Sequence, residues 1–260
     1  MPNSSSLTYQ PTRSTINPAG IPLTAYPKSL IPENEAARLR TLHLYQIANT
    51  TPEPIFDDYV AWSAQLFNTP ISLISLVDED YVYFKAVAGA EGVPGLNRTE
   101  SMCSAAILPD VPVVLSDYKV ESCALIKPDV AQAMGLNFYA GAALRMPDGS
   151  RIGMLAVIGR EARGLSPNES DVLSRLASLV SQTIELRFSY LNSPHPEAWA
   201  AAQAELAETL DDNAALARYL TTRNHGLNLD DDDTQDLVLR RLKGVEKVLQ
   251  RRMSEALAVA

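Results

Sequence analysis

Cysteine, histidine and long apolar runs are all scarce in this sequence, and each shortage excludes a class of protein. Two cysteines, Cys103 and Cys123, are too few for a scaffold stapled by disulfides, so we expect a reduced, cytoplasmic protein. No stretch reaches the ~18 apolar residues that a membrane helix needs. Residues 1–10 lack the basic and apolar regions of a secretory signal. The sequence therefore predicts neither membrane insertion nor secretion.

Metal ligands, phosphate loops and excess basic charge are also missing. The three histidines are not spaced with Cys, Asp or Glu as a metal site requires. Neither a Gly-rich phosphate loop nor a serine elbow is present. The formal net charge of −9 favours a surface that repels phosphate backbones, so we expect no nucleic-acid partner. We predict no catalytic set and no metal site, and the sequence leaves any cofactor unknown.

What is present divides the chain into three parts. Hydrophobic residues make up 46% of the chain, enough to bury a core. Residues 1–32 contain repeated prolines without an apolar period, which predicts an extended lead. Residues 33–192 carry helix and strand patterns and form the predicted main domain. A break at 192–196 separates them from a helix-prone extension, residues 193–260.

The order of elements predicted for the main domain is typical of an α+β fold, with an antiparallel sheet flanked by helices. The predicted helices cover residues 33–49, 56–67 and 101–108, and a long helix starts at 167. The predicted strands cover residues 71–77, 81–87, 111–115, 138–146 and 152–158, with a loop at 89–97. Pro112 suggests an edge position for its strand.

Helix signals are sharpest in the second half of the chain. Ser166 and Glu169 stand at the spacing of a capping box, with Pro167 at the first helical position. Residues 197–223, followed by His225-Gly226, and the segment after 230 predict two further helices. These two helices either pack on the domain for stability or act as output elements toward a partner.

Three segments together resemble GAF domains. The segment ISLISLVDEDYVYFK at 71–85 resembles the first hairpin of that family, and SMCSAAIL at 101–108 resembles the family segment that follows this hairpin. Residues 138–155 resemble the last hairpin of the family. The resemblance covers residues 33–192. It implies a sheet with a small-molecule pocket on one face and helices on the other, and a sensing or signalling role rather than catalysis. It also implies a homodimer formed through helices 33–49 and 167–191.

The resemblance also points to candidate pocket residues. They are Tyr83, Lys85, Met102, Cys103, Phe138, Tyr139, Arg145 and Met154. Because neighbours in a strand alternate faces, at most about half of them can point inward. Many relatives of this subtype carry a His two residues after the cysteine, and a Cys and an Asp in the last strand. Here those positions are Ala105, Ala156 and Gly159, which predicts a more apolar pocket or its loss.

Cys103 leaves two alternatives open. It could serve a thiol-based redox sensor or an enzyme similar to free methionine sulfoxide reductases, with Cys123 as the resolving thiol. It could also be a buried small hydrophobe. A disulfide requires the two Cα atoms within ~7 Å. A bilin-binding photoreceptor is less favoured, because such domains place His directly after the attachment Cys, whereas Ser104 and Ala124 follow here.

The sequence thus predicts a cytoplasmic sensory module rather than an enzyme. Its expected ligand is a small apolar or amphipathic molecule, and its expected partners are a signalling protein and a second copy of the chain. We expect neither a membrane nor a nucleic acid among its partners.

Overall fold

The computed structural model describes residues 29–90, 92–121, 123–127, 129–224 and 227–258. Most of the predicted lead, and the helix end predicted at His225-Gly226, lie outside these residues. The elements in chain order are α1 (Glu35–Leu44), α2 (Pro54–Leu66), β1 (Ile71–Val77), β2 (Tyr81–Ala88), β3 (Gly95–Asn97), α3 (Met102–Ala106), β4 (Val113–Leu115), α4 (Asp129–Ala133), β5 (Phe138–Arg145), β6 (Arg151–Gly159), α5 (Pro167–Leu191), α6 (Ala198–Asn224) and α7 (Asp232–Ala258).

The strands form one six-stranded antiparallel sheet in the order β3-β2-β1-β6-β5-β4. This confirms the predicted α+β class. The two predicted hairpins, β1–β2 and β5–β6, meet at the centre, where β1 pairs with β6. Gly153 makes that pairing possible, because a Cβ there would stand 1.9 Å from the Ser75 carbonyl oxygen. The strand after Pro112 lies at the edge, as its proline predicts.

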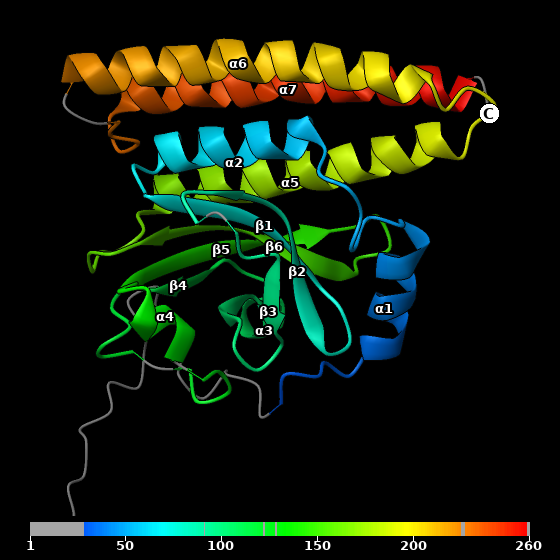
Figure 1. Ribbon diagram of the computed structural model, residues 1–260. Coiled ribbons are helices and arrows are strands. Elements are labelled where there is room, and N and C mark those ends of the chain that lie inside the picture. Colours follow the sequence, from blue (N-terminus) through cyan, green and yellow to red (C-terminus); the bar gives the residue numbers. More distant parts are fainter. Residues whose placement is uncertain (1–28, 91, 122, 128, 225–226, 259–260) are drawn as a thin grey trace, which may run out of the picture.

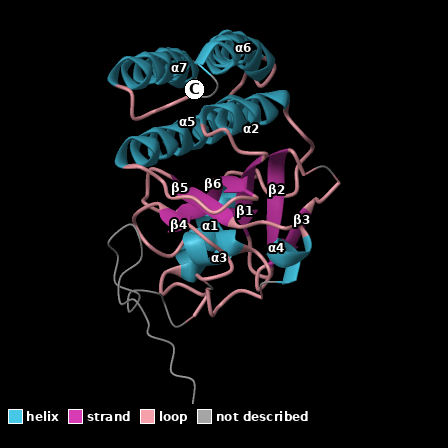
Figure 2. Cartoon of the chain, turned by 90° about the vertical axis from the view of Figure 1, so that its left-hand side faces the viewer, coloured by secondary structure: helices cyan, strands magenta, loops and turns pink. Residues whose placement is uncertain are grey.

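Helices cover the sheet in layers (Figure 1). One face packs against α2 and α5, and a second layer, the α6–α7 hairpin, lies on top of these two helices. The view turned by 90° shows the same order of layers, with α3 and α4 below the sheet (Figure 2). Helix α6 runs along α2, and α7 runs along α5.

Each face of the sheet has its own apolar core. The core on the helix side continues from the sheet through α2 and α5 into the hairpin, where Leu206, Leu210, Leu242 and Leu249 are buried. The amphipathic pattern of the last two helices therefore serves packing on the domain. The core on the other side lies under β1, β2, β5 and β6 and includes all of α3 except Ser104.

Local signals decide where most helices begin and end. The capping box is confirmed, since Glu169 N–H donates to Ser166 Oγ at 3.2 Å and Ser166 N–H donates to Glu169 Oε2 at 2.9 Å. The prediction that the first helix reaches residue 49 is wrong. It ends at Leu44, because Gln46 adopts a φ of 47° and leaves the helical region.

Two short elements differ from the sequence prediction. Part of the predicted loop 89–97 is a strand, β3, and Gly95 lets it approach β2, since a Cβ there would stand 2.2 Å from the Val82 carbonyl oxygen. Helix α4 carries no strong capping or periodic signal and was not predicted. In the described parts of the chain, no helix has both the length and the apolar composition needed to cross a membrane.

Candidate functional site

An apolar pocket of about 210 Å³ opens on the sheet face opposite the long helices. Its walls come from the undersides of β1, β2, β5 and β6, from α3 and α4, and from the segment between β4 and α4. The lining side chains are Ile71, Leu73, Phe84, Val87, Ala90, Val93, Leu96, Glu100, Ser101, Met102, Cys103, Tyr118, Cys123, Ile126, Lys127, Val130, Ala131, Met134, Leu136, Tyr139 and Ile158. Most of them are apolar, as expected for a small-molecule site.

Thiols, phenols and the Ser101 hydroxyl are the uncharged polar groups of the pocket. Tyr139 Oη donates to Cys103 Sγ at 3.6 Å, and both side chains are buried. Burial raises the pKa of the Cys103 thiol, although hydrogen bonds from Ser75, Tyr139 and Ser101 oppose the rise. Burial likewise raises the pKa of Tyr118, and interactions with Cys103 and Cys123 raise it further. These groups are therefore uncharged at neutral pH.

Charged groups stand only at two positions of the described lining, Glu100 and Lys127. The Glu100 carboxylate accepts a hydrogen bond from Asn97 Nδ2 at 2.8 Å, and the Lys127 side chain is exposed. The pocket thus offers apolar walls, a few hydroxyl and thiol groups, and no concentrated charge. Its chemistry suits a small uncharged ligand.

Three of the eight predicted site residues line this pocket together, namely Met102, Cys103 and Tyr139. Met154 is fully buried in the same apolar core, behind the lining. The cysteine therefore borders the pocket, as the family resemblance implies, and Cys123 lies in the same lining. Both cysteines are free thiols.

The other four predicted residues lie elsewhere, so their assignment to the pocket needs correction. Tyr83 and Lys85 follow the alternation of β2 onto the helix side, because Val82 and Phe84 face the pocket core. Phe138 also faces the helix side, where the Arg163 guanidinium lies 4.8 Å from its ring centre. Arg145 lies at the exposed end of β5.

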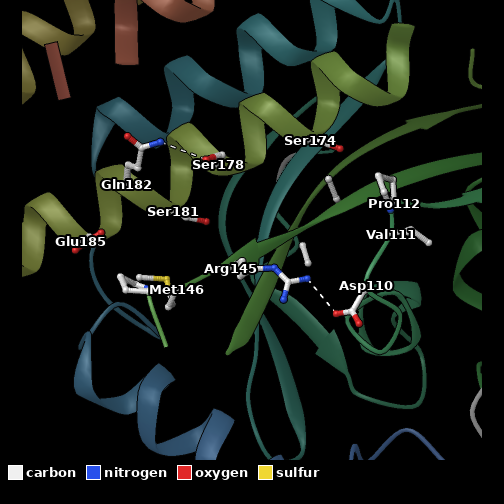
Figure 3. Close-up of a pocket in the computed structure, with 13 residues that line it drawn as sticks. Asp110, Val111, Pro112, Arg145, Met146, Ser174, Ser178, Ser181, Gln182 and Glu185 are labelled. Carbon is white, nitrogen blue, oxygen red and sulfur yellow. Dashed lines mark hydrogen bonds and ion pairs between the residues drawn. The ribbon is translucent and has the colours of Figure 1, made fainter. Parts of the chain in front are cut away.

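Arg145 instead borders a second, open hollow of about 360 Å³ between α5 and the end of β5 (Figure 3). Polar side chains of α5 face it, including Ser174, Ser178 and Gln182. At the other side Arg145 Nη2 donates to the exposed Asp110 carboxylate at 3.1 Å. This hollow, called the polar groove after the α5 side chains, has a mixed polar and apolar lining and is less apolar than the pocket beneath the sheet. The apolar pocket is therefore the better candidate site.

The pocket is also lined by residues that the sequence does not predict for it, chiefly Phe84, Tyr118, Ile126 and Met134. Strand alternation could have predicted Phe84, because it stands between Tyr83 and Lys85 and its side chain points to the opposite face of the sheet. The segment after β4 lacks a clear period, so no sequence pattern could place Tyr118, Ile126 or Met134 over the sheet. Within the described residues, no three His, Cys, Asp or Glu side chains gather closely enough to hold a metal ion.

The two thiols should differ in reactivity. Cys103 is 2% exposed, whereas Cys123 is half-buried at the pocket wall. We expect iodoacetamide at neutral pH to label Cys123 more than ~10-fold faster than Cys103 in the folded protein, since access limits the reaction of a buried thiol. Peptide mass spectrometry after timed labelling measures both rates. Equal rates in urea provide the control, and fast labelling of Cys103 in the folded protein would contradict the placement.

Comparison with known proteins finds a family match and several relatives. The sequence model of the GAF domain matches residues 51–184. A cyclic di-GMP phosphodiesterase of Pseudomonas aeruginosa is 30% identical over 166 residues, which make up 63% of this chain and 28% of that protein. The chain thus spans less than a third of that relative.

Solved structures of GAF domains are also similar. The GAF domain of an Acinetobacter phosphoenolpyruvate-protein phosphotransferase is 19% identical, with a TM-score of 0.43, covering 57% of this chain and 93% of that one. The second GAF domain of DevS from Mycobacterium smegmatis is 15% identical, with a TM-score of 0.40, covering 52% and 94%. Because the family model matches just over half of this chain, the chain belongs to the GAF domain family of sensory signalling modules.

Proposed function

We propose that this sensory module responds to a small, uncharged apolar or amphipathic molecule bound in the pocket beneath the sheet. The observation that carries the proposal is the pocket of about 210 Å³ with mostly apolar walls and buried hydroxyl and thiol groups. Burial of an apolar ligand there is favourable by about 25 cal/mol per Å² of apolar surface removed from water. The few polar groups would orient the ligand rather than supply most of its affinity.

Native and denaturing mass spectra of the purified protein test this proposal. We expect a native mass above that of the chains, with the excess lost on denaturation, because the ligand is held without a covalent bond. The mass of the excess would begin to identify the ligand. An excess retained on denaturation would point to attachment at a cysteine and would contradict reversible binding. If the spectra show only the bare chain, addition of small planar apolar molecules must produce the bound species.

An enzymatic role is the second candidate, and two observations bear on it. The relative from Pseudomonas aeruginosa is a cyclic di-GMP phosphodiesterase, but the chain matches only 28% of it. A thiol-based enzyme needs an attacking thiolate, whereas burial raises the pKa of both Cys103 and Cys123. We therefore propose a non-catalytic role. Purified protein should leave cyclic di-GMP and free methionine sulfoxide unchanged, and turnover that Cys103→Ser abolishes would favour the enzyme.

We further propose that the protein works in the cytoplasm, as a homodimer that contacts a signalling protein. The family resemblance assigns the dimer interface to α1 and α5, and the surroundings of these two helices differ from each other. Helix α1 packs beside the sheet, and α5 is packed between α2, α7 and β5. Light scattering at several protein concentrations should give twice the mass of the chain, and the mass of one chain throughout would contradict the homodimer.

A further inference from the structure

Strand β2 carries a pocket residue and a buried charge on adjacent positions. Phe84 lines the pocket, and Lys85 points to the opposite face. The pairing of β1 with β2 shifts at this place, because Ile74 pairs with Ala86 while Ser75 pairs with Phe84. Lys85 is thus the extra residue of a β-bulge, which directs it and Ala86 to the helix side.

The Lys85 ammonium is completely satisfied where it lies. Its Nζ donates to Thr50 Oγ1, to the Thr51 carbonyl oxygen and to Glu53 Oε1, each at 2.8 Å. The ammonium has three protons, so every donor has an acceptor. Its side chain is only 2% exposed. A rotation of the backbone at the bulge would therefore break hydrogen bonds that water cannot replace.

Glu53 extends this arrangement to the C-terminal hairpin. Its carboxylate also accepts hydrogen bonds from Arg187 Nε of α5 at 2.8 and 3.0 Å, and from Trp199 Nε1 of α6 at 3.0 Å. Trp199 is buried in the first turn of α6. We call Glu53, Lys85, Arg187 and Trp199 the Glu53 cluster. Further polar side-chain contacts between hairpin and domain come from α7 and from the segment before it.

We propose that occupancy of the pocket loosens the start of α6 through the Phe84–Lys85 bulge and the Glu53 cluster. This inference rests on the proposed function, since it assigns the output of the same pocket. A ligand that displaces the Phe84 ring turns the peptide between Phe84 and Lys85. The Lys85 ammonium then loses its three hydrogen bonds. As a result, the Glu53 carboxylate loses its position beside Trp199. The hairpin is thereby the output element of the pocket.

Thermodynamic reciprocity fixes the direction in which variants of the Glu53 cluster change the affinity for the ligand. If the bound ligand weakens the Glu53 cluster, then a substitution that weakens the cluster favours the form that binds the ligand and raises the affinity for it. Variants of the cluster should therefore bind more tightly, although none of its members lines the pocket. A coupling of ordinary size corresponds to about 5-fold or more in Kd.

Indole is a suitable probe, because it is small, planar and largely apolar. Titration calorimetry would give its Kd for the full chain and for two variants, Lys85→Met and Trp199→Phe. The first leaves Glu53 paired with Arg187, and the second keeps an aromatic ring while removing the N–H donor. Lys243→Met on the exposed face of α7 is the matched control. Hydrogen exchange of the first turns of α6 would be followed with and without indole.

We expect both cluster variants to bind indole about 5-fold or more tightly than the control, and indole to speed exchange at the start of α6. Equal affinities together with unchanged exchange would overturn the inference and leave the proposed function standing. Absence of indole binding in every variant would count against the proposed function itself, and the inference would fall with it. If Lys85→Met does not fold, Trp199→Phe decides alone.

Discussion

Replacing Glu53 with glutamine is expected to destabilise the protein by about 3–5 kcal/mol, the range for removal of one partner from a buried ion pair. The variant would leave the Lys85 and Arg187 cations facing an uncharged amide, and both cations are buried. It would also offer Trp199 Nε1 a weaker acceptor. Because the cluster joins α2, β2, α5 and α6, the loss should affect the whole fold.

Denaturation in urea, followed by circular dichroism, measures this loss as a shift of the midpoint. Glu205→Gln is the matched control, since Glu205 also pairs with two cations, Arg251 and Arg252, but on the surface between α6 and α7. Exposed pairs contribute about 0–1 kcal/mol, so the control should unfold nearly as the natural chain does. Similar stabilities for Glu53→Gln and the control would show that the cluster does not hold the layers together.

The same carboxyl contributes a dependence of stability on pH. Burial alone would raise the pKa of Glu53, but hydrogen bonding and charge from Lys85, with Arg187 and Trp199, lower it below the ordinary value of 4.5. Its contribution is therefore complete above pH 4.5 and is lost as the pH falls through the folded-state pKa. The stability of Glu53→Gln should fall less steeply than that of the natural chain over this range.

Ala131→Trp is expected to lower the affinity for a pocket ligand by more than ~10-fold, which corresponds to about 1.4 kcal/mol. Ala131 lies on α4, half-buried, and its side chain lines the pocket. An indole ring placed there would occupy the space that the ligand needs. Titration with indole compares the variant with the natural chain.

Ala133→Trp supplies the control, because Ala133 lies on the same short helix but is exposed. It introduces the same ring without filling the hollow, so binding should be unchanged. Near-ultraviolet circular dichroism would establish that both variants keep their tertiary packing. Undiminished binding by Ala131→Trp would place the ligand elsewhere, with the polar groove beside α5 as the next candidate.

Sequence patterns predicted the strands and the long helices well, because these elements carry strong local signals. Runs of aliphatic and aromatic residues indicate β1 and β2, and the capping box indicates the start of α5. The sequence does not predict the weakly patterned elements β3 and α4. Short elements form through tertiary contacts, so local sequence contains little information about them.

The direction of individual side chains was harder to predict. The family resemblance predicts Tyr83 and Lys85 in the pocket, whereas the alternation with Phe84 puts them on the helix side. The bulge at Lys85 depends on the pairing with β1, which no local pattern reveals. Likewise, the amphipathic pattern of α6 and α7 predicts helices with one buried face, but their packing on α2 and α5 is a property of the whole fold.

Binding of a small apolar molecule beneath the sheet is tested most directly by the methyl groups of methionine side chains. Met102 and Met134 line the pocket, whereas Met146 lines the polar groove. In a protein labelled with ¹³C at the methionine methyl groups, we expect added indole to shift the nuclear magnetic resonance signals of Met102 and Met134 and to leave that of Met146 in place. A shift of Met146 alone, or no shift of any signal at saturating indole, would contradict binding in this pocket.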